Sequence, residues 1–384
     1  MKAILNGTLV LPDSTREGAI LYDRKIIDLV SNDEAKAAAD ETLDARGLFI
    51  TPGLVDTHVH GVCGVEVLDG TEDAIRTMAH ELLSGGVTSF LATTETVAWD
   101  RLETAFEQIR TVREESRRPG FSGAEILGCH AEGPFLNPVR KGAMQEAHIL
   151  PPDAEKVLPY ADVIRVLTLS PEMPGADACI RTLTEKTDIR LSMGHTDATY
   201  EEAMHAFDLG VTRATHLFNA MPSMHHRAPG PVCAALTRDV FTELIADTYH
   251  VDRALFPLVA RLKGDRLVLI TDTGRFAGMP DGTYAYEGAT YILKGLSCRF
   301  PDGTITGSVM RLNMGVRNLR DFGHIPFHQA LRAATLSAAA SCGADDRKGS
   351  LEPGKDADLV VMDGDCRVLH TIVGGETRYT ADRA

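Results

Sequence analysis

The sequence predicts an α/β fold, a (β/α)8 barrel with a small β-sandwich domain. Three observations lead to this prediction. Short, continuously apolar runs alternate with stretches of helical periodicity along the middle of the chain. Eight such runs fall within about 220 residues, close to the ~250 residues of a typical (β/α)8 barrel. Both ends of the chain, in contrast, consist of short strand-like pieces separated by turns.

The eight runs begin at residue 54. They are 54–59, 87–94, 125–131, 163–169, 189–194, 213–218, 241–246 and 266–271. Most are too continuously apolar to be half-exposed antiparallel strands, so they favour strands of a parallel sheet that is covered on both faces.

Helical periodicity separates these runs, for example at 73–83, 99–112 and 199–209. In the last stretch Thr199 and Glu202 have the spacing of a capping box. Strands that alternate with helices predict a parallel sheet with right-handed crossovers, and eight units predict a TIM barrel. A doubly wound open sheet is the alternative. It fits less well because no glycine-rich phosphate loop follows an early strand.

The two ends of the chain have the same texture. Strand-like pieces occur at 4–11, 19–22 and 25–30, and again at 349–363 and 371–379. We therefore expect residues 1–51 and 343–384 to form one small β-sandwich domain. The barrel then spans 52–342, and the helical stretch 327–341 closes it.

Composition narrows the possible partners. The chain has 384 residues, 44% of them hydrophobic, and a net charge of −15 from 39 basic and 54 acidic side chains. Such an acidic protein is a poor partner for nucleic acid or an anionic membrane. No apolar run of membrane-spanning length and no signal peptide is seen, and the seven cysteines are scattered without CxxC spacing. We expect a soluble cytoplasmic protein with reduced thiols.

Histidines and carboxylates lie at or just after the ends of the predicted strands, where the active sites of such barrels lie. The residues concerned are His58, His60, His130, Glu132, His195, His216, His250 and Asp272. Imidazoles and a carboxylate without a thiolate cluster suit Zn²⁺ or a similar divalent ion. Such an ion acidifies a bound water, and a carboxylate that is not a ligand can move its proton. The pattern predicts a metal-dependent hydrolase with Asp272 in that role.

The His58-Val-His60 string has two interpretations. Both imidazoles project from the same face of a strand and can reach one metal centre. Taken alone, the same string also fits two hydrogen-bonded histidines at a strand end.

Longer strings carry a resemblance to a known family. The string PGLVDTHVHG (52–61) resembles the first metal motif of the amidohydrolase superfamily. HAEGPFLN (130–137), GHTDAT (194–199), THLFNAMP (215–222), IADTYHVD (245–252), LITD (269–272) and DGTITGS (302–308) resemble the N-acetylglucosamine-6-phosphate deacetylase family. The resemblance extends over almost the whole chain and includes the tail 349–363.

The resemblance implies hydrolysis of the acetamide of an amino-sugar phosphate, with N-acetylglucosamine-6-phosphate as the expected substrate. It implies that Glu132, His195 and His216 bind the principal metal, with Zn²⁺ as the expected ion. His58 and His60 would bind a second metal, and Asp272 would deprotonate water and then protonate the leaving amine. His250 would polarise or contact the substrate. The remaining substrate contacts implied are Ala143, Asn219, Ala220, Arg227, Thr306, Gly307 and Ser308.

The resemblance also implies a homodimer in which Arg227 reaches the phosphate in the neighbouring subunit. The residue type suits this role, because a guanidinium binds phosphate in bidentate fashion. The alternative interpretation of Arg227 is a solvated loop arginine with no role in binding. The strand ending at residue 169 carries no lysine that could be carboxylated, so Glu132 must supply the anionic ligand. This argues against dihydroorotase-like or urease-like chemistry.

Three positions depart from the family pattern. Met144 replaces a usual histidine, and Arg275 and Arg311 stand where small or apolar residues are usual. Loop drift explains such changes, but so does a different substrate, such as another N-acetylhexosamine phosphate or a non-sugar N-acyl compound. Two other functions are also compatible with the sequence. One is a different amidohydrolase reaction, such as cyclic amide opening or deamination, and the other is a non-catalytic sugar-phosphate sensor.

Overall fold

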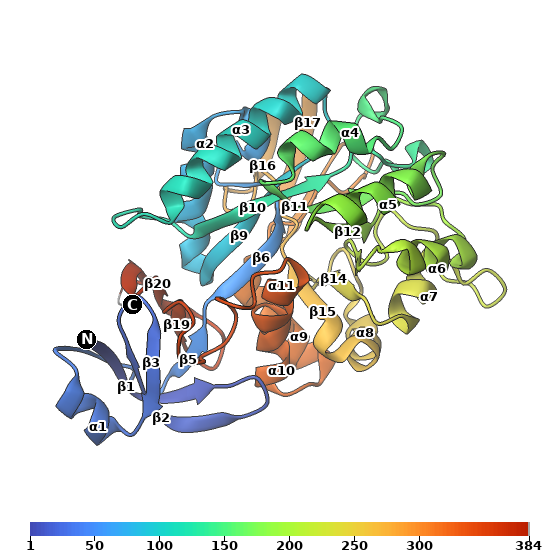
Figure 1. Cartoon of the computed structure of the whole chain (residues 1–384). Helices are drawn as coiled ribbons and strands as arrows, with labels where there is room; N and C mark the ends of the chain where they lie inside the picture. Colours follow the sequence, from blue (N-terminus) through green and yellow to red (C-terminus); the bar gives the residue numbers. More distant parts are fainter. Residues whose placement is uncertain (383–384) are drawn as a thin grey trace.

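The computed structural model describes residues 1–382, which form a parallel barrel with a smaller mixed sheet beside it (Figure 1). Eight parallel strands make up the barrel, and their order around it follows the chain. They are β6 (Leu54–Val59), β9 (Val87–Thr94), β10 (Glu125–Glu132), β11 (Ile164–Leu169), β12 (Arg190–Met193), β13 (Arg213–Ala214), β14 (Phe241–Ile245) and β15 (Leu267–Ile270). The prediction of a (β/α)8 barrel is confirmed.

The barrel closes between its first and last strands through residues just beyond β15. Val59 and Thr273 form a parallel bridge. The Asp272 N–H donates to the His58 carbonyl at 2.8 Å, and the His60 N–H donates to the Thr273 carbonyl at 2.8 Å. Closure therefore brings the His58-Val-His60 string against Asp272.

Helices cover the outside of the barrel. They are α2 (Glu72–Glu81), α3 (Trp99–Ser116), α4 (Ala154–Val157), α5 (Ala176–Lys186), α6 (Tyr200–Leu209), α7 (Gly230–Thr237), α8 (Phe256–Lys263) and α9 (Leu312–Gly323). At the start of α6 the Glu202 N–H donates to Thr199 Oγ1 while the Thr199 N–H donates to the Glu202 carboxylate. The predicted capping box is present. Among residues 1–382, no helix combines the length and apolar character needed to cross a membrane.

The predicted helix 327–341 is two helices, α10 (Phe327–Ala333) and α11 (Leu336–Ser341). Thr335 separates them with a non-helical backbone, and its hydroxyl donates to the Leu331 carbonyl at 2.9 Å. A threonine hydroxyl that binds the preceding turn competes with the helical hydrogen bonds. The prediction of one continuous helix was wrong at this point.

Both chain termini build the smaller sheet (Figure 1). Its strands are β1 (Lys2–Val10), β2 (Thr15–Tyr22), β3 (Ile26–Val30), β4 (Glu41–Asp44), β5 (Phe49–Pro52), β19 (Leu359–Met362), β20 (Val368–Val373) and β21 (Glu376–Thr380). Ile26 of β3 and Ile372 of β20 lie in one buried cluster although their strands are far apart in the sheet order. The sheet thus folds around a common core, and helix α1 (Asn32–Ala38) covers its other face through Ala35. We propose domain boundaries at 51/52 and 342/343.

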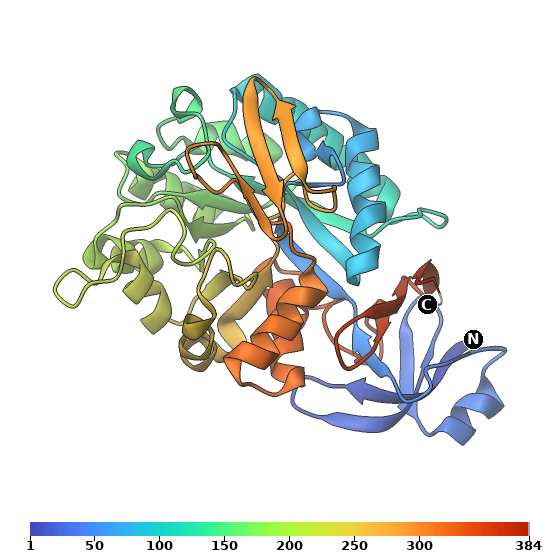
Figure 2. The same cartoon turned by 180° about the vertical axis from the view of Figure 1, so that it is seen from behind.

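A third sheet lies in the segment between β15 and α9, where the sequence analysis expected no element. It contains β16 (Gly282–Tyr286), β17 (Ala289–Lys294) and β18 (Ser297–Arg299), which pair antiparallel. Figure 2 shows this orange segment in front of the blue part of the barrel. The strands are only partly buried and contain no continuous apolar run, so they lack the signal used for the barrel strands.

A short hairpin, β7 (Gly61–Val62) with β8 (Val65–Glu66), follows β6.

A buried ion network joins the C-terminal tail to the base of the barrel. Lys348 Nζ lies 2.6 Å from Glu125 at the start of β10, 2.7 Å from Asp358 and 3.1 Å from Asp356. Arg347 adds a second contact to Glu125 at 2.8 Å. Burial would lower the pKa of Lys348, but the three carboxylates hold it above its usual value. Arg347 would still face Glu125 and Asp356 without this cation, but the buried Asp358 would lose its cationic partner.

We therefore expect Lys348→Met to lower the free energy of unfolding by about 3 kcal/mol, since breaking a buried ion pair by removing one partner costs about 3–5 kcal/mol. Urea unfolding at neutral pH measures this. Arg238→Met is the control, because Arg238 and Asp208 form an exposed pair, and it should cost under about 1 kcal/mol. Equal losses in the two variants would contradict the prediction.

Candidate active site

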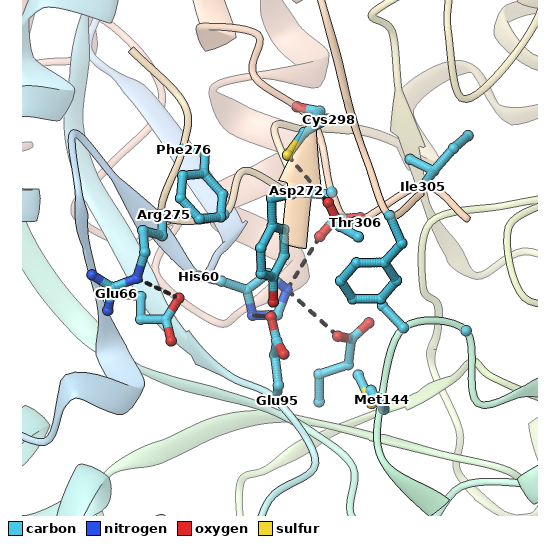
Figure 3. A pocket seen from close by; sticks show the side chains of 18 of the residues that line it. His60, Glu66, Glu95, Met144, Asp272, Arg275, Phe276, Cys298, Ile305 and Thr306 are labelled. Atoms are coloured by element: carbon cyan, nitrogen blue, oxygen red, sulfur yellow. Dashed lines mark hydrogen bonds and ion pairs between the residues drawn. The ribbon is translucent and has the colours of Figure 1, made fainter. Parts of the chain in front are cut away.

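A pocket of about 460 Å³ lies at the carboxyl ends of the barrel strands (Figure 3). Most of the residues that the sequence analysis selected line it. They are His60, Glu132, Ala143, His195, His216, Asn219, Ala220, His250, Asp272, Thr306, Gly307 and Ser308. His58 is fully buried behind the pocket wall, and Arg227 is exposed outside it.

Glu132 is the centre of one buried cluster. Its Oε1 lies 2.9 Å from His216 Nε2 and 3.3 Å from His195 Nε2. The two imidazole Nε2 atoms are 3.1 Å apart. His195 Nδ1 donates to the Arg140 carbonyl at 2.8 Å, so the Nε2 lone pair of His195 faces Glu132.

A second cluster adjoins the first through the same carboxylate. His58 Nε2 and His60 Nε2 are 3.1 Å apart, and His60 Nε2 is 3.1 Å from Asp272 Oδ1. Glu132 Oε1 lies 3.4 Å from His58 Nε2, and Glu132 Oε2 lies 3.5 Å from His60 Nε2. Glu132 therefore stands between the two pairs of imidazoles.

Several of these side chains leave their strands through a left-handed backbone. The φ angles of His195, His216 and Asp272 are +48°, +27° and +51°. Such angles are uncommon for residues other than glycine and occur often at functional sites. They also explain why β13 ends at Ala214, whereas the prediction extended this strand to residue 218.

The charges in this centre are strongly coupled. Burial would raise the pKa of Glu132, but His58 and His195 hold it well below its usual value. Burial would lower the pKa of His58, yet the carboxylates of Asp272, Glu132 and Glu243 raise it well above its usual value. Carboxylates and imidazole nitrogens packed this closely need positive charge between them. A set of histidines with one carboxylate is a normal ligand set for Zn²⁺ and similar ions, so the residues fit a divalent metal.

His250 has a fixed orientation at the edge of the pocket. Its Nδ1 donates to Asp247 Oδ2 at 2.6 Å, and the backbone N–H groups of Tyr249 and His250 donate to Asp247 Oδ1. Burial would lower the pKa of His250, but the Asp247 carboxylate raises it. With Nδ1 bound to Asp247, Nε2 is the nitrogen available to a substrate.

Sequence reasoning missed two buried partners of the histidines. Glu243 of β14 lies 3.0 Å from His58 Nδ1, and the fully buried Arg213 of β13 contacts the same carboxylate. Burial would raise the pKa of Glu243, but His58 and Arg213 hold it well below its usual value. The available signal was a single carboxylate inside the otherwise apolar run 241–246.

The three departures from the family pattern lie in different surroundings. Met144 and Arg275 line the pocket, whereas Arg311 is exposed and contacts Ser84. Arg275 lies 3.5 Å from Glu66 (Figure 3). It also contacts Asp69 and covers the ring of Tyr286 at 3.8 Å. The guanidinium of Arg275 is thus already paired within the pocket wall.

Comparison with known proteins agrees with this geometry. The amidohydrolase family model matches residues 49–378. N-acetylglucosamine-6-phosphate deacetylase of Bacillus subtilis (strain 168) is 37% identical over 357 residues, 91% of this chain and 88% of the relative. N-acetylgalactosamine-6-phosphate deacetylase of Escherichia coli O157:H7 is 35% identical over 339 residues, 85% and 87% of the two chains. A mutant N-acetyl-D-glucosamine-6-phosphate deacetylase from Mycobacterium smegmatis, solved in complex with N-acetyl-D-glucosamine-6-phosphate, superposes with a TM-score of 0.89 at 29% identity, covering 99% of both chains.

We expect Arg275→Met to lower the free energy of unfolding by about 2 kcal/mol, because hydrogen bonds to charged groups contribute about 1.5–3 kcal/mol each. Urea unfolding measures the change. Arg311→Met serves as the control, since its guanidinium is exposed, and it should shift stability by less than about 0.5 kcal/mol. If Arg275→Met unfolds like wild type, the guanidinium does not hold the pocket wall together.

Proposed function

The chain belongs to the amidohydrolase family and, within it, to the N-acetylglucosamine-6-phosphate deacetylases, and on this premise we propose that it hydrolyses N-acetylglucosamine-6-phosphate to glucosamine-6-phosphate and acetate. The observation that carries the proposal is the position of Glu132 between two pairs of imidazoles, with Asp272 beside it. This is a site for hydrolysis assisted by a metal.

Glu132, His195 and His216 would hold the principal metal, and His58 and His60 would hold a second one. Zn²⁺ is the proposed ion. When bound, the ion polarises the amide carbonyl and acidifies a water molecule. Because Glu132 approaches both clusters, its carboxylate is placed to serve either ion.

Asp272 is placed to move the proton. Burial would raise its pKa, but His58 and His60 hold it below its usual value, so the carboxylate is ionised at neutral pH. It would accept a proton from the attacking water and deliver it to the amide nitrogen as the C–N bond breaks. His250 Nε2 would donate to the carbonyl oxygen while Asp247 holds the ring.

The sugar phosphate would lie against the other predicted contacts. Asn219 and Ala220 lie three and four residues after His216, and Thr306–Ser308 and Ala143 line the same pocket. Arg227 lies in the exposed part, 223–228, of the loop 221–229 and does not line this chain's own pocket. We propose that it completes the phosphate site of a neighbouring subunit in a homodimer.

A second substrate has specific support. Met144 lines the pocket where the family usually carries a histidine, and a relative named for N-acetylgalactosamine-6-phosphate is 35% identical. Another N-acetylhexosamine phosphate is therefore the alternative.

We also propose a cytoplasmic location, since the structure pairs none of the seven cysteines in a disulfide.

Acetate release from matched substrates tests the function. Purified protein loaded with Zn²⁺ is assayed with N-acetylglucosamine-6-phosphate, N-acetylgalactosamine-6-phosphate and unphosphorylated N-acetylglucosamine. We expect the highest kcat/KM with the first. A higher value with the second selects the alternative, and release from none of the three refutes deacetylation of amino sugars.

The metal assignment predicts that Glu132→Ala loses bound metal together with turnover. The substitution removes the carboxylate that both clusters share, so His195 and His216 lose their anionic partner. Elemental analysis after dialysis measures the metal content. Glu95→Gln, which changes a pocket carboxylate 3.9 Å from His60 Nδ1, is the control and should retain metal. Full metal content in Glu132→Ala would contradict the assignment.

Asp272→Asn should retain the metal held by Glu132, His195 and His216 but lose about 10²–10⁴-fold in kcat, the usual contribution of general acid–base catalysis. Steady-state kinetics and elemental analysis on the same preparation separate the two effects. Loss of all metal along with activity would instead make Asp272 chiefly a ligand.

Arg227→Ala should raise KM for the phosphorylated sugar at least tenfold with metal content unchanged, because a charge-assisted bidentate contact is lost. The slow reaction with unphosphorylated sugar should change little. Arg253→Ala, on another exposed part of the barrel, is the matched control. A wild type that is monomeric at full activity would refute a role across subunits.

A further inference from the structure

We propose that Glu243, paired with Arg213, is a positioning residue that fixes His58 for binding the second metal. This inference rests on the proposed function, since it concerns the metal centre of the same active site. It concerns two fully buried side chains that do not line the pocket.

The contact between Glu243 and His58 determines the tautomer of the ring. His58 Nδ1 lies 3.0 Å from Glu243 Oε2, and an ionised carboxylate can only accept a hydrogen bond. Nδ1 therefore carries a proton, and Nε2, the nitrogen left for a metal, lies 3.1 Å from His60 Nε2 and 3.4 Å from Asp272 Oδ1. Carboxylates that bind the outer nitrogen of a ligand histidine orient the ring and make it more basic.

Arg213 keeps that carboxylate charged and in place. Both side chains are fully buried, and Arg213 Nη2 lies 2.5 Å from Glu243 Oε1. Arg213 also contacts Thr57, next to His58 in sequence, and Ser341 of α11. A buried charge is tolerated when it is paired and hydrogen-bonded in this way.

The same carboxylate also touches the other cluster. Glu243 Oε2 accepts the backbone N–H of His216 at 3.1 Å, at the point where φ of His216 is +27°. Glu243 thus connects the backbone that carries one predicted ligand to the ring of another. It ties the two clusters together from below the pocket.

The group His58, His130 and Glu243 is not a metal site in its own right. His130 Nδ1 donates to the Thr57 carbonyl at 3.0 Å, and its Nε2 lies 2.7 Å from the Thr168 hydroxyl. Both ring nitrogens of His130 are therefore used. His60 offers a contrast to His58, because within residues 1–382 its Nδ1 has no hydrogen-bond partner. Of the two histidines, only His58 has its Nδ1 held by a carboxylate within hydrogen-bond distance.

The test is metal binding by Glu243→Gln. Metal content after dialysis against Zn²⁺, and Zn²⁺ affinity by titration calorimetry, are measured for wild type and variant. We expect wild type to hold two ions per chain and the variant to bind the second ion 10–100-fold more weakly, the usual effect of losing such a partner. The ion at Glu132, His195 and His216 should remain.

Two further variants separate positioning from stability. Arg213→Met/Glu243→Gln leaves no unpaired buried charge, so it should recover stability lost in Glu243→Gln without recovering Zn²⁺ affinity. Glu125→Gln changes a buried carboxylate of the Lys348 network and should lose stability but keep both ions. If the double variant recovers affinity along with stability, the role of Glu243 is only structural and the inference is wrong.

The outcomes also distinguish this inference from the proposed function. Wild-type affinity in Glu243→Gln overturns the inference while deacetylation stands. A wild type with one ion per chain overturns it as well, because His58 is then no ligand. A wild type that binds no metal and releases no acetate refutes the proposed function itself.

Discussion

The closure of the barrel is the constraint on which the site depends. The first and last strands meet through backbone hydrogen bonds from Asp272 to His58 and from His60 to Thr273. The residues that complete the barrel are thus the residues that carry the chemistry. A change in register at this junction would move Asp272 away from the histidines, so the geometry of the site and the integrity of the barrel are linked.

Two buried charge systems stand at opposite ends of β10. At its carboxyl end Glu132 faces imidazoles, and at its start Glu125 faces Lys348 and Arg347. Around Glu125, the negative charge is balanced by Lys348 and Arg347 of the same chain. The first offers imidazoles that are charged only when protonated, which is the arrangement expected of a centre that receives a cation from solution.

Much of this could be predicted from the sequence because the signals were local. Continuous apolar runs located the barrel strands, and their carboxyl ends located His58, Glu132 and Asp272. The β16–β18 sheet gave no such signal, since its strands are half exposed and their partners are set by long-range pairing. Glu243 was missed because its role depends on the three-dimensional approach of β14 to β6, which no spacing within one segment reveals.

The carboxylates that line the pocket give a physical reason why a bound phosphate would need a cation from outside the pocket. Five carboxylates line the wall, those of Glu66, Glu95, Glu132, Asp272 and Glu287. Among the described residues that line it, the one arginine is Arg275, and Asp69 and Glu66 already pair with it. An anionic phosphate bound there would face net negative charge unless metal ions and a further guanidinium offset it. This charge balance is the physical reason for proposing that a cation from beyond the wall, Arg227 of a neighbouring subunit, reaches the phosphate.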